Sequence, residues 1–177
     1  VLAMAKAKTK SKPTPAPAAP IKWVYGTKVT SKDGLAHGGF QWPDKPGVVE
    51  CPDWKPTKEC GNGLHFWENG CGDSDASTHN VRGDVRWYLV RADESDVVRL
   101  EGKVKAKTVE VLQVGDCATI TAAMLALVPG PVICCTTTAG YEGTATAGYA
   151  GTATAGDAGA ATAGDAGTAT ADRKSTR

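Results

Sequence analysis

An eight-residue repeat near the C-terminal end constrains the fold of this chain more than any other feature. Copies begin at Thr138, Thr146, Thr154 and Thr162 with no residue inserted between them, and a decayed copy begins at Thr170. A strict period requires successive copies to adopt one conformation and to stack on one another. The repeat therefore predicts an architecture rather than a chemical reaction.

Each octad combines a strand-like segment with a turn. Its two glycines lie three residues apart, as at Gly140 and Gly143, and they favour a tight turn between them. The segment that follows alternates Thr with Ala, which is the two-residue period of a strand. One strand and one turn make half of a flattened coil, so we expect two octads to form one coil of sixteen residues.

This coil predicts which positions stack and which positions turn. Thr152 and Thr154 should lie on Thr168 and Thr170, and the strand from Thr144 should lie on the strand sixteen residues later. The predicted repeat surface comprises Thr144, Thr146, Thr152, Thr154, Thr168 and Thr170. The predicted turn positions are Tyr141, Tyr149, Asp157 and Asp165. Disorder is the alternative, because an Ala/Gly/Thr tract has little apolar surface to offset the entropy of ordering.

Composition divides the rest of the chain. All five Trp residues lie between Trp23 and Trp87, so the core should form there. We expect a small α+β domain, mainly antiparallel β, followed by a short β-solenoid-like repeat and preceded by a disordered tail. The predicted parts are a Lys/Ala/Pro-rich tail over 1–21, the domain over 22–115, a linking helix and strand over 116–135, and the octapeptide-repeat β-solenoid over 136–177, whose last repeat is decayed.

Local patterns predict the elements of the domain. Asp116 is a good N-cap and Pro129 a stop signal, which together predict a helix over 117–127 whose apolar face covers the first coil. Alternating or aromatic-rich segments predict strands over 22–30, 38–42, 64–67, 84–91, 97–100 and 107–112.

Cysteine and histidine side chains form the densest chemical cluster of the sequence. The candidates for a zinc site are Cys51, Cys60, His65, Cys71 and His79. Their residue types suit zinc, but their spacing lacks the close Cys-x2-Cys pairs of common structural sites. The alternative is that the thiols pack as small apolar groups and that His65 is a buried ring bonded to a backbone carbonyl. A catalytic role for Cys60 or His65 is a further alternative, although no recognised signature surrounds either residue.

Charge and hydropathy favour protein partners. The formal net charge is +1, which gives no drive toward a specific nucleic acid or an anionic membrane. The sequence contains no signal peptide or transmembrane segment, so we expect a cytoplasmic or virion-associated protein. Self-association through the repeat is a second expected contact, and zinc is the only cofactor that the residues suggest.

The octads resemble the repeats of bacterial ice-nucleation proteins, which are thought to form β-solenoids that order water. Thr144-Ala-Thr146, Thr152-Ala-Thr154 and Thr168-Ala-Thr170 match the Thr-x-Thr element of that family, whereas Ala160-Ala-Thr162 departs from it. This array is far too short to nucleate ice efficiently. The resemblance implies the fold of the repeat more than its activity.

A second resemblance links the domain to small uncharacterised proteins of phages and prophages. Its motifs are Cys60-Gly-Asn-Gly-Leu-His65, an earlier Gly39-Phe-Gln-Trp42 and a later Gly83-Asp-Val85, followed by the octads. Trp67 stands where that family often has Cys. The resemblance implies a viral context and no assigned reaction.

Together these patterns favour a non-enzymatic repeat protein with a structural or interaction role. In this interpretation the domain caps a short β-solenoid. An ice- or water-structuring protein that acts through its Thr-x-Thr rows is one alternative. A small enzyme or zinc-binding domain centred on Cys60 and His65 is the other.

Overall fold

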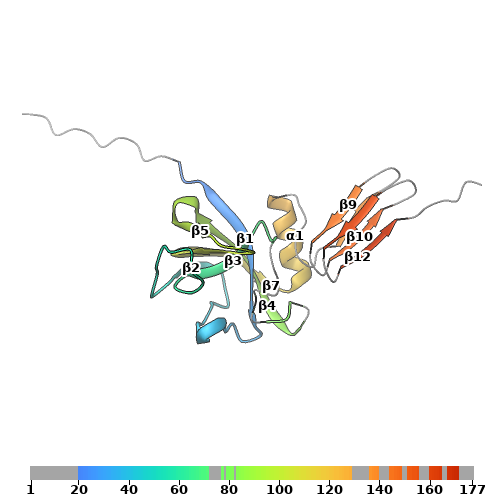
Figure 1. Ribbon diagram of the computed structural model, residues 1–177. Coiled ribbons are helices and arrows are strands. Elements are labelled where there is room, and N and C mark those ends of the chain that lie inside the picture. Colours follow the sequence, from blue (N-terminus) through green and yellow to red (C-terminus); the bar gives the residue numbers. More distant parts are fainter. Residues whose placement is uncertain are drawn as a thin grey trace, which may run out of the picture.

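The computed structural model describes residues 20–71, 77, 79–81, 83–128, 136–139, 144–148, 151–155, 160–164 and 167–171. The predicted tail lies almost wholly outside the described residues, and the four predicted turn positions Tyr141, Tyr149, Asp157 and Asp165 lie outside them as well. The described part is mainly antiparallel β in the N-terminal region and contains one α-helix, which agrees with the predicted fold class (Figure 1).

The N-terminal sheet has seven strands in the order β2-β7-β4-β1-β3-β6-β5 and is open, with β2 and β5 at its edges. The strands are β1 Trp23–Ser31, β2 Gly47–Glu50, β3 Leu64–Glu68, β4 Val85–Asp93, β5 Val97–Arg99, β6 Val104–Ala106 and β7 Thr108–Gly115. Two 3-10 turns, η1 His37–Gly39 and η3 Glu94–Asp96, lie between strands. All named pairs in this sheet are antiparallel.

Both faces of the sheet are covered, and β4 shows why. Successive side chains of a strand point to opposite faces, and here both sets are apolar. Trp87 and Leu89 belong to one core cluster, while Tyr88 and Val90 belong to the other. The second cluster also contains residues of β6 and β7, although three strands separate these two in the sheet, so the sheet curls around that cluster.

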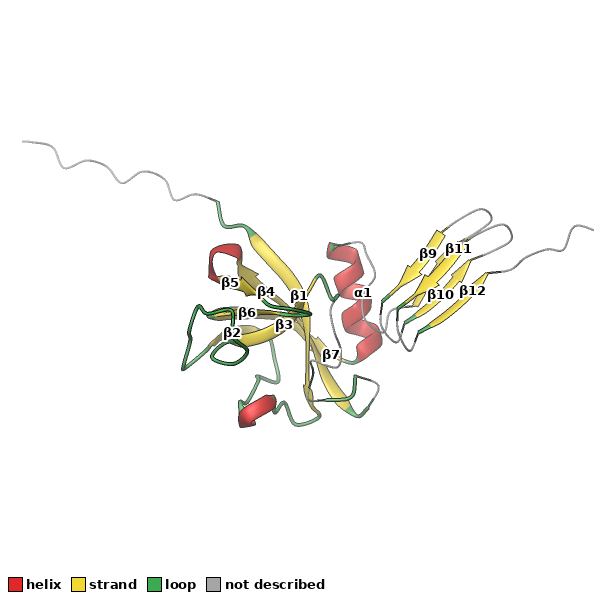
Figure 2. Ribbon diagram, in the orientation of Figure 1, coloured by secondary structure: helices red, strands yellow, loops and turns green. Residues whose placement is uncertain are grey.

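The helix α1, Cys117–Leu127, covers the first face of the sheet. The Asp116 side chain accepts a hydrogen bond of 2.8 Å from the Thr119 backbone N–H, which confirms the predicted N-cap. Ile120 and Met124 are fully buried among residues of β1 and β4. The same cluster extends to alanines of the repeat, so the helix lies between the sheet and the repeat strands (Figure 2).

The repeat strands pair in parallel with the predicted offset of sixteen residues. Thr152 of β10 Thr152–Ala155 pairs with Thr168 of β12 Thr168–Ala171 and with Thr136 of β8 Thr136–Ala139. Thr144 of β9 Thr144–Ala147 pairs with Ala160 of β11 Ala160–Ala163. Alternate octads therefore contribute to two separate parallel stacks, one of three strands and one of two.

Alanines line the inside of the repeat, and their burial falls along the chain. Ala145 and Ala153 are 3% and 0% exposed, respectively. The inner alanines of β11, Ala161 and Ala163, are half-buried, and the alanines of β12 are exposed. The thin alanine core is thus well covered near α1 and poorly covered at its far end.

Two expectations for the domain were wrong. Residues 38–42 do not form a strand, because Gly38 and Gly39 adopt φ values of 73° and 78°, which turn the chain. Only a single bridge between Leu35 and Gln41 remains there. The short strands β2 and β6 were also missed, because each is too brief for a period to stand out.

None of the helices in the described ranges is both long and apolar enough to cross a membrane.

Candidate functional site

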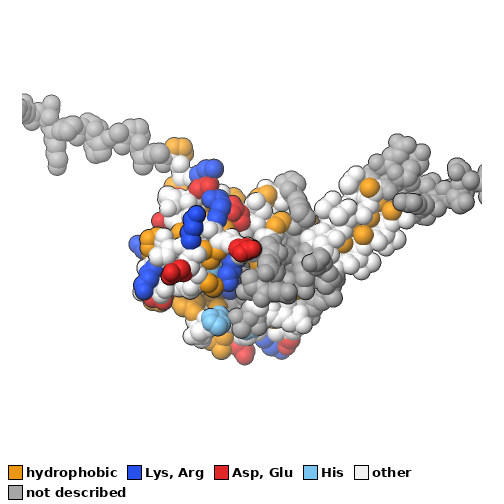
Figure 3. Space-filling view, viewed as in Figure 1, with side chains coloured by type: hydrophobic (Ala, Val, Ile, Leu, Met, Phe, Trp, Pro, Cys, Tyr) orange, Lys and Arg blue, Asp and Glu red, His pale blue; other side chains and the backbone are white. Residues whose placement is uncertain are grey.

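The outer faces of the repeat strands carry threonines. In β9 the two Thr residues are exposed and the two Ala residues buried, and in β10 Thr154 is exposed while Thr152 is half-buried. Parallel register places Thr168 and Thr170 of β12 next to the same positions of β10. The described repeat strands present no charged side chain, in contrast to the domain, where charged groups are frequent (Figure 3).

The two stacks of repeat strands differ in how regularly threonine recurs at the outer positions of successive strands. The stack that contains β10 and β12 repeats Thr at both outer positions, whereas Ala160 interrupts one row of the other stack opposite Thr144. Neighbouring strands lie about 4.8 Å apart, and alternate residues of one parallel strand about 6.6 Å apart, so the first stack forms a regular grid of hydroxyl and methyl groups. Such a grid can contact an ordered surface without any catalytic group.

A second candidate site lies in the domain, on the opposite face of the sheet from α1. It is a groove of about 380 Å³ between the segment 36–42 and the loop 51–63. Its polar lining includes Lys28, His37, Asp53, Asn62 and His65. Phe40 supplies aromatic surface, and its ring packs edge to face on the buried Trp42 at a centroid distance of 6.4 Å.

One wall of the groove is fixed by a buried lysine. Lys105 of β6 is fully buried, and its Nζ donates to the backbone carbonyls of Glu59 at 2.7 Å and Gly61 at 3.0 Å. The ammonium also lies 5.8 Å from the Trp54 ring centroid. Gly63 packs against the Lys105 stem so closely that a side chain there would collide with it. The lysine thus holds the loop in place by charge-assisted hydrogen bonds.

His65 is held in the same way, by backbone groups of the loop. Its Nε2 accepts a hydrogen bond of 3.4 Å from the Gly61 backbone N–H, and the ring also bonds to the backbone of Gly63. Burial lowers the pKa of His65 to about 4, and the charges of Lys103, Lys28 and Lys105 act in the same direction. The ring is therefore neutral at pH 7 and engaged with the loop, which supports a structural role.

The lowered pKa of His65 predicts a pH dependence of stability. Unfolding returns the ring to a pKa near 6.5, so the unfolded chain binds a proton below that pH that the folded chain does not bind. The stabilising contribution of neutral His65 is present above about pH 6.5 and is lost as the pH falls toward 4. We expect this loss to reach about 2 kcal/mol, less than full linkage allows, because solvent screens a half-buried ring.

Urea unfolding of wild type and His65→Gln between pH 4 and pH 7 measures this effect, because Gln does not titrate. The difference in unfolding free energy between the two proteins should shrink as the pH falls, while contributions from carboxylates cancel. Parallel curves over this range would contradict a buried neutral imidazole.

The remaining candidates for the metal site lie apart from one another or are already bonded. Cys51 lines the groove, where burial raises the pKa of its thiol and its Sγ donates to Asp53 at 3.1 Å. Cys60 is exposed and does not line the groove. Cys71 lies in a different hollow, beside Glu68 and Arg99. His79 has a buried Nε2 that finds no hydrogen-bond partner among the described residues.

Within the described ranges, no three His, Cys, Asp or Glu side chains form a group that could hold a metal ion. The structure brings Cys51 and His65 to one groove but does not gather the predicted five. The zinc hypothesis stays a prediction, which metal analysis of the purified protein tests directly. Lys28 and Lys105 were missed, because a lysine within a strand pattern normally indicates a solvent-facing position.

The open antiparallel sheet, its covering helix and the octad strands define a small β domain that leads into a repeat array. A family model described as a domain of unknown function, DUF7666, matches residues 24–123. The chain belongs to this family. The matched segment runs from β1 into α1, as far as Ala123. No solved structure matches the chain.

Ice nucleation proteins are similar to part of the chain. The ice nucleation protein InaU of Pantoea ananas is 41% identical over 83 residues, which are 45% of this chain and 8% of that protein. An ice nucleation protein of Enterobacter agglomerans is also 41% identical over 83 residues, or 6% of its length. One from Pseudomonas fluorescens is 32% identical over the same share. The chain thus spans less than a tenth of each of these relatives.

Proposed function

We propose that this chain is a non-enzymatic scaffold in which the domain and α1 cap a short β-solenoid built from the octads. The observation that carries the proposal is the continuous core that joins Ile120 and Met124 to the inner alanines of the repeat. A coil of Thr and Ala buries little surface by itself, and about three repeats are usually needed for stability. A domain that covers the first coil supplies the missing contact surface at the N-terminal end of the repeat, so fewer repeats are needed.

The outward threonines are the contact surface of this scaffold. Their side chains are small and uncharged, so the surface is shaped by the backbone register rather than by flexible side chains. We infer that this surface or the exposed strand edges contact a protein partner, with self-association as one form of that contact. The order of motifs along the chain also leads us to infer a phage or prophage origin, which the neighbouring genes would test.

Substitutions in the inner alanine row test the solenoid. Ala153 is 0% exposed, and its register partner Ala169 is exposed. Ala153→Leu should overpack the thin core and destabilise the repeat by about 2 kcal/mol, whereas Ala169→Leu should change stability by less than about 0.5 kcal/mol. Hydrogen exchange of the amides of β9 to β12 measures both. Equal protection in the two variants would remove the solenoid.

Water structuring is a second candidate function, supported by the ice nucleation relatives and by the regular threonine grid of β10 and β12. The double variant Thr154→Lys and Thr170→Lys breaks one outer row without touching the inner alanines. We expect wild type at high concentration to show thermal hysteresis that this variant loses. Val48→Lys, at an exposed position of β2, is the control and should keep it. No hysteresis from wild type would exclude this function.

A further inference from the structure

Lys28 carries a charge that nothing in the described part of the chain neutralises. Its side chain is half-buried on the face of β1 that borders the groove, and its Nζ lies 5.8 Å from the Trp42 ring centroid. Among the described residues no carboxylate forms an ion pair with it. Burial, together with the nearby charge of Lys103, lowers the pKa of Lys28 to about 8. A cation that is partly removed from water and has no anion beside it costs free energy, and a bound anion would offset that cost.

The charges around the groove are predominantly positive. The charges of Lys28, Lys103 and Lys105 all lower the pKa of His65. The neutral His65 ring adds no charge of its own. The Lys105 ammonium donates hydrogen bonds to two backbone carbonyls of the loop. Asp53 is the carboxylate that lines the groove, and it already accepts hydrogen bonds from Asn62 at 2.6 Å and from the Cys51 thiol. The groove thus contains the Lys28 ammonium, which has no ion-pair partner among the described residues, and the Asp53 carboxylate, which already accepts two hydrogen bonds.

The remaining surface of the groove suits an apolar body. Phe40 lines it as a half-buried ring, and the buried Trp42 lies behind, where it packs against the Tyr88 ring at a centroid distance of 5.4 Å. The Cα atoms of Gly38 and Gly39 face open space, so no side chain closes this edge. A volume of about 380 Å³ lies within the range of small-molecule sites, which combine apolar walls with a few fixed polar groups.

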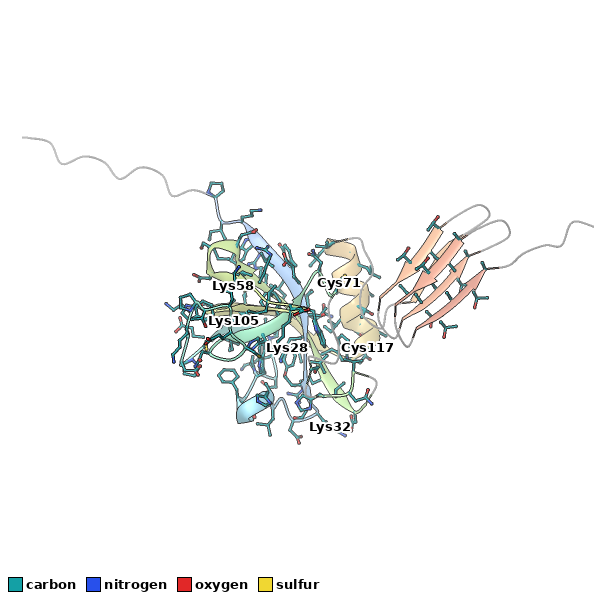
Figure 4. All side chains as sticks on the ribbon, in the orientation of Figure 1. Lys28, Lys32, Lys58, Cys71, Lys105 and Cys117 are labelled. Carbon is teal, nitrogen blue, oxygen red and sulfur yellow. The ribbon has the colours of Figure 1, made fainter. Side chains whose placement is uncertain are left out.

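We propose that this groove binds a small organic monoanion, whose charged group pairs with the Lys28 ammonium and whose apolar or aromatic body lies against Phe40, with the buried Trp42 ring behind it. The fixed loop from Cys51 to Gly63 preorganises the site, because Lys105, His65 and Asn62 hold it before a ligand arrives. The site belongs to the domain and does not depend on the role of the repeat. Figure 4 labels Lys28 and Lys105 in the part of the domain away from the repeat strands.

Benzoate is a suitable probe, with benzamide as its neutral isostere. Titration of the full chain, followed by backbone amide NMR, should give saturable shifts in residues 36–42 and 61–65 with benzoate and not with benzamide. Lys28→Met should weaken benzoate binding by about tenfold or more, because the ion pair is lost. Lys32→Met is the matched control, since Lys32 is an exposed lysine just after β1 that pairs with Asp84 at 2.8 Å. It should bind as wild type does.

The pH dependence of benzoate binding gives a test that uses the wild-type sequence and needs no substitution. Around Lys28, the groups that titrate or carry charge are Lys103, Lys105, His65, His37, Asp53 and Cys51. Free Lys28 loses its proton as the pH rises through about 8, so benzoate binding should weaken between pH 7 and pH 9. After reductive methylation with a carbon-13 label, the Lys28 signal should titrate at a higher pH in the presence of benzoate.

Three results would overturn the site. They are equal shifts with benzoate and benzamide, unchanged benzoate binding in folded Lys28→Met, and a Lys28 titration that benzoate does not move. The last measurement uses the wild-type sequence, so it decides the question even where the Met variant does not fold.

Discussion

Gly26→Ala should destabilise the domain by about 3 kcal/mol or more, which is a large part of the stability of a typical domain. Gly26 is buried at the centre of β1, where it pairs with Glu68 of β3 and with Val90 of β4. A methyl group at this position would overlap with the Trp67 carbonyl oxygen and with the Phe66 ring. The carbonyl belongs to a neighbouring strand and cannot move without breaking the ladder, so the added carbon forces the two strands apart.

Gly115→Ala is the matched control for this prediction. Gly115 is the last residue of β7 in the same sheet, and an added methyl group there would make only ordinary contacts, 3.6 Å or more from Thr119 and Ile120. We expect its unfolding free energy to stay within about 0.5 kcal/mol of wild type. Chemical denaturation monitored by tryptophan fluorescence compares the two, since Trp67 and Trp87 pack against each other in the core. Similar midpoints for both variants would contradict a close approach of the strands at Gly26.

The elements with a long, regular pattern could be predicted from the sequence. The helix was predicted over the residues that form it, because Asp116 and Pro129 mark its two ends. The sixteen-residue register of the repeat followed from the phase of Thr and Ala alone. The order of strands in the sheet did not, since β1 lies beside β3 and β4 through contacts far apart in the sequence. The prediction of a strand over 38–42 was wrong because two adjacent glycines permit either an extended chain or a turn.

The candidate site shows the same division between local and distant information. The spacing of Cys and His residues carries no information on which strands bring them together, and only Cys51 and His65 reach one groove. The bonded state of His65 was foreseen as an alternative, because its neighbours Leu64 and Phe66 are apolar. The lysines were not foreseen. A cation that fixes a loop through backbone carbonyls leaves no residue pattern, because any residue in the loop supplies the same carbonyl groups.

Ile120→Ala should destabilise the domain and the repeat together, by about 3 kcal/mol. Ile120 is 0% exposed in α1, and its cluster includes Trp87 and Leu89 of the sheet as well as Ala145 and Ala153 of the repeat. Truncation leaves a cavity in this shared cluster, and close-packed cores relax only partly around such a cavity. Because the first coil has little apolar surface of its own, we expect its order to depend on this shared core.

Hydrogen exchange measured residue by residue separates the two parts of this prediction. Amides of β4 report on the domain and amides of β10 on the repeat, and in Ile120→Ala both sets should exchange faster than in wild type. Leu127→Ala removes an apolar side chain of the same helix that is 47% exposed, so it should leave both sets nearly unchanged. Faster exchange in β4 with wild-type protection in β10 would mean that the repeat is stable without its cap. The role of α1 would then be confined to the sheet, and the octads would need no domain to order them.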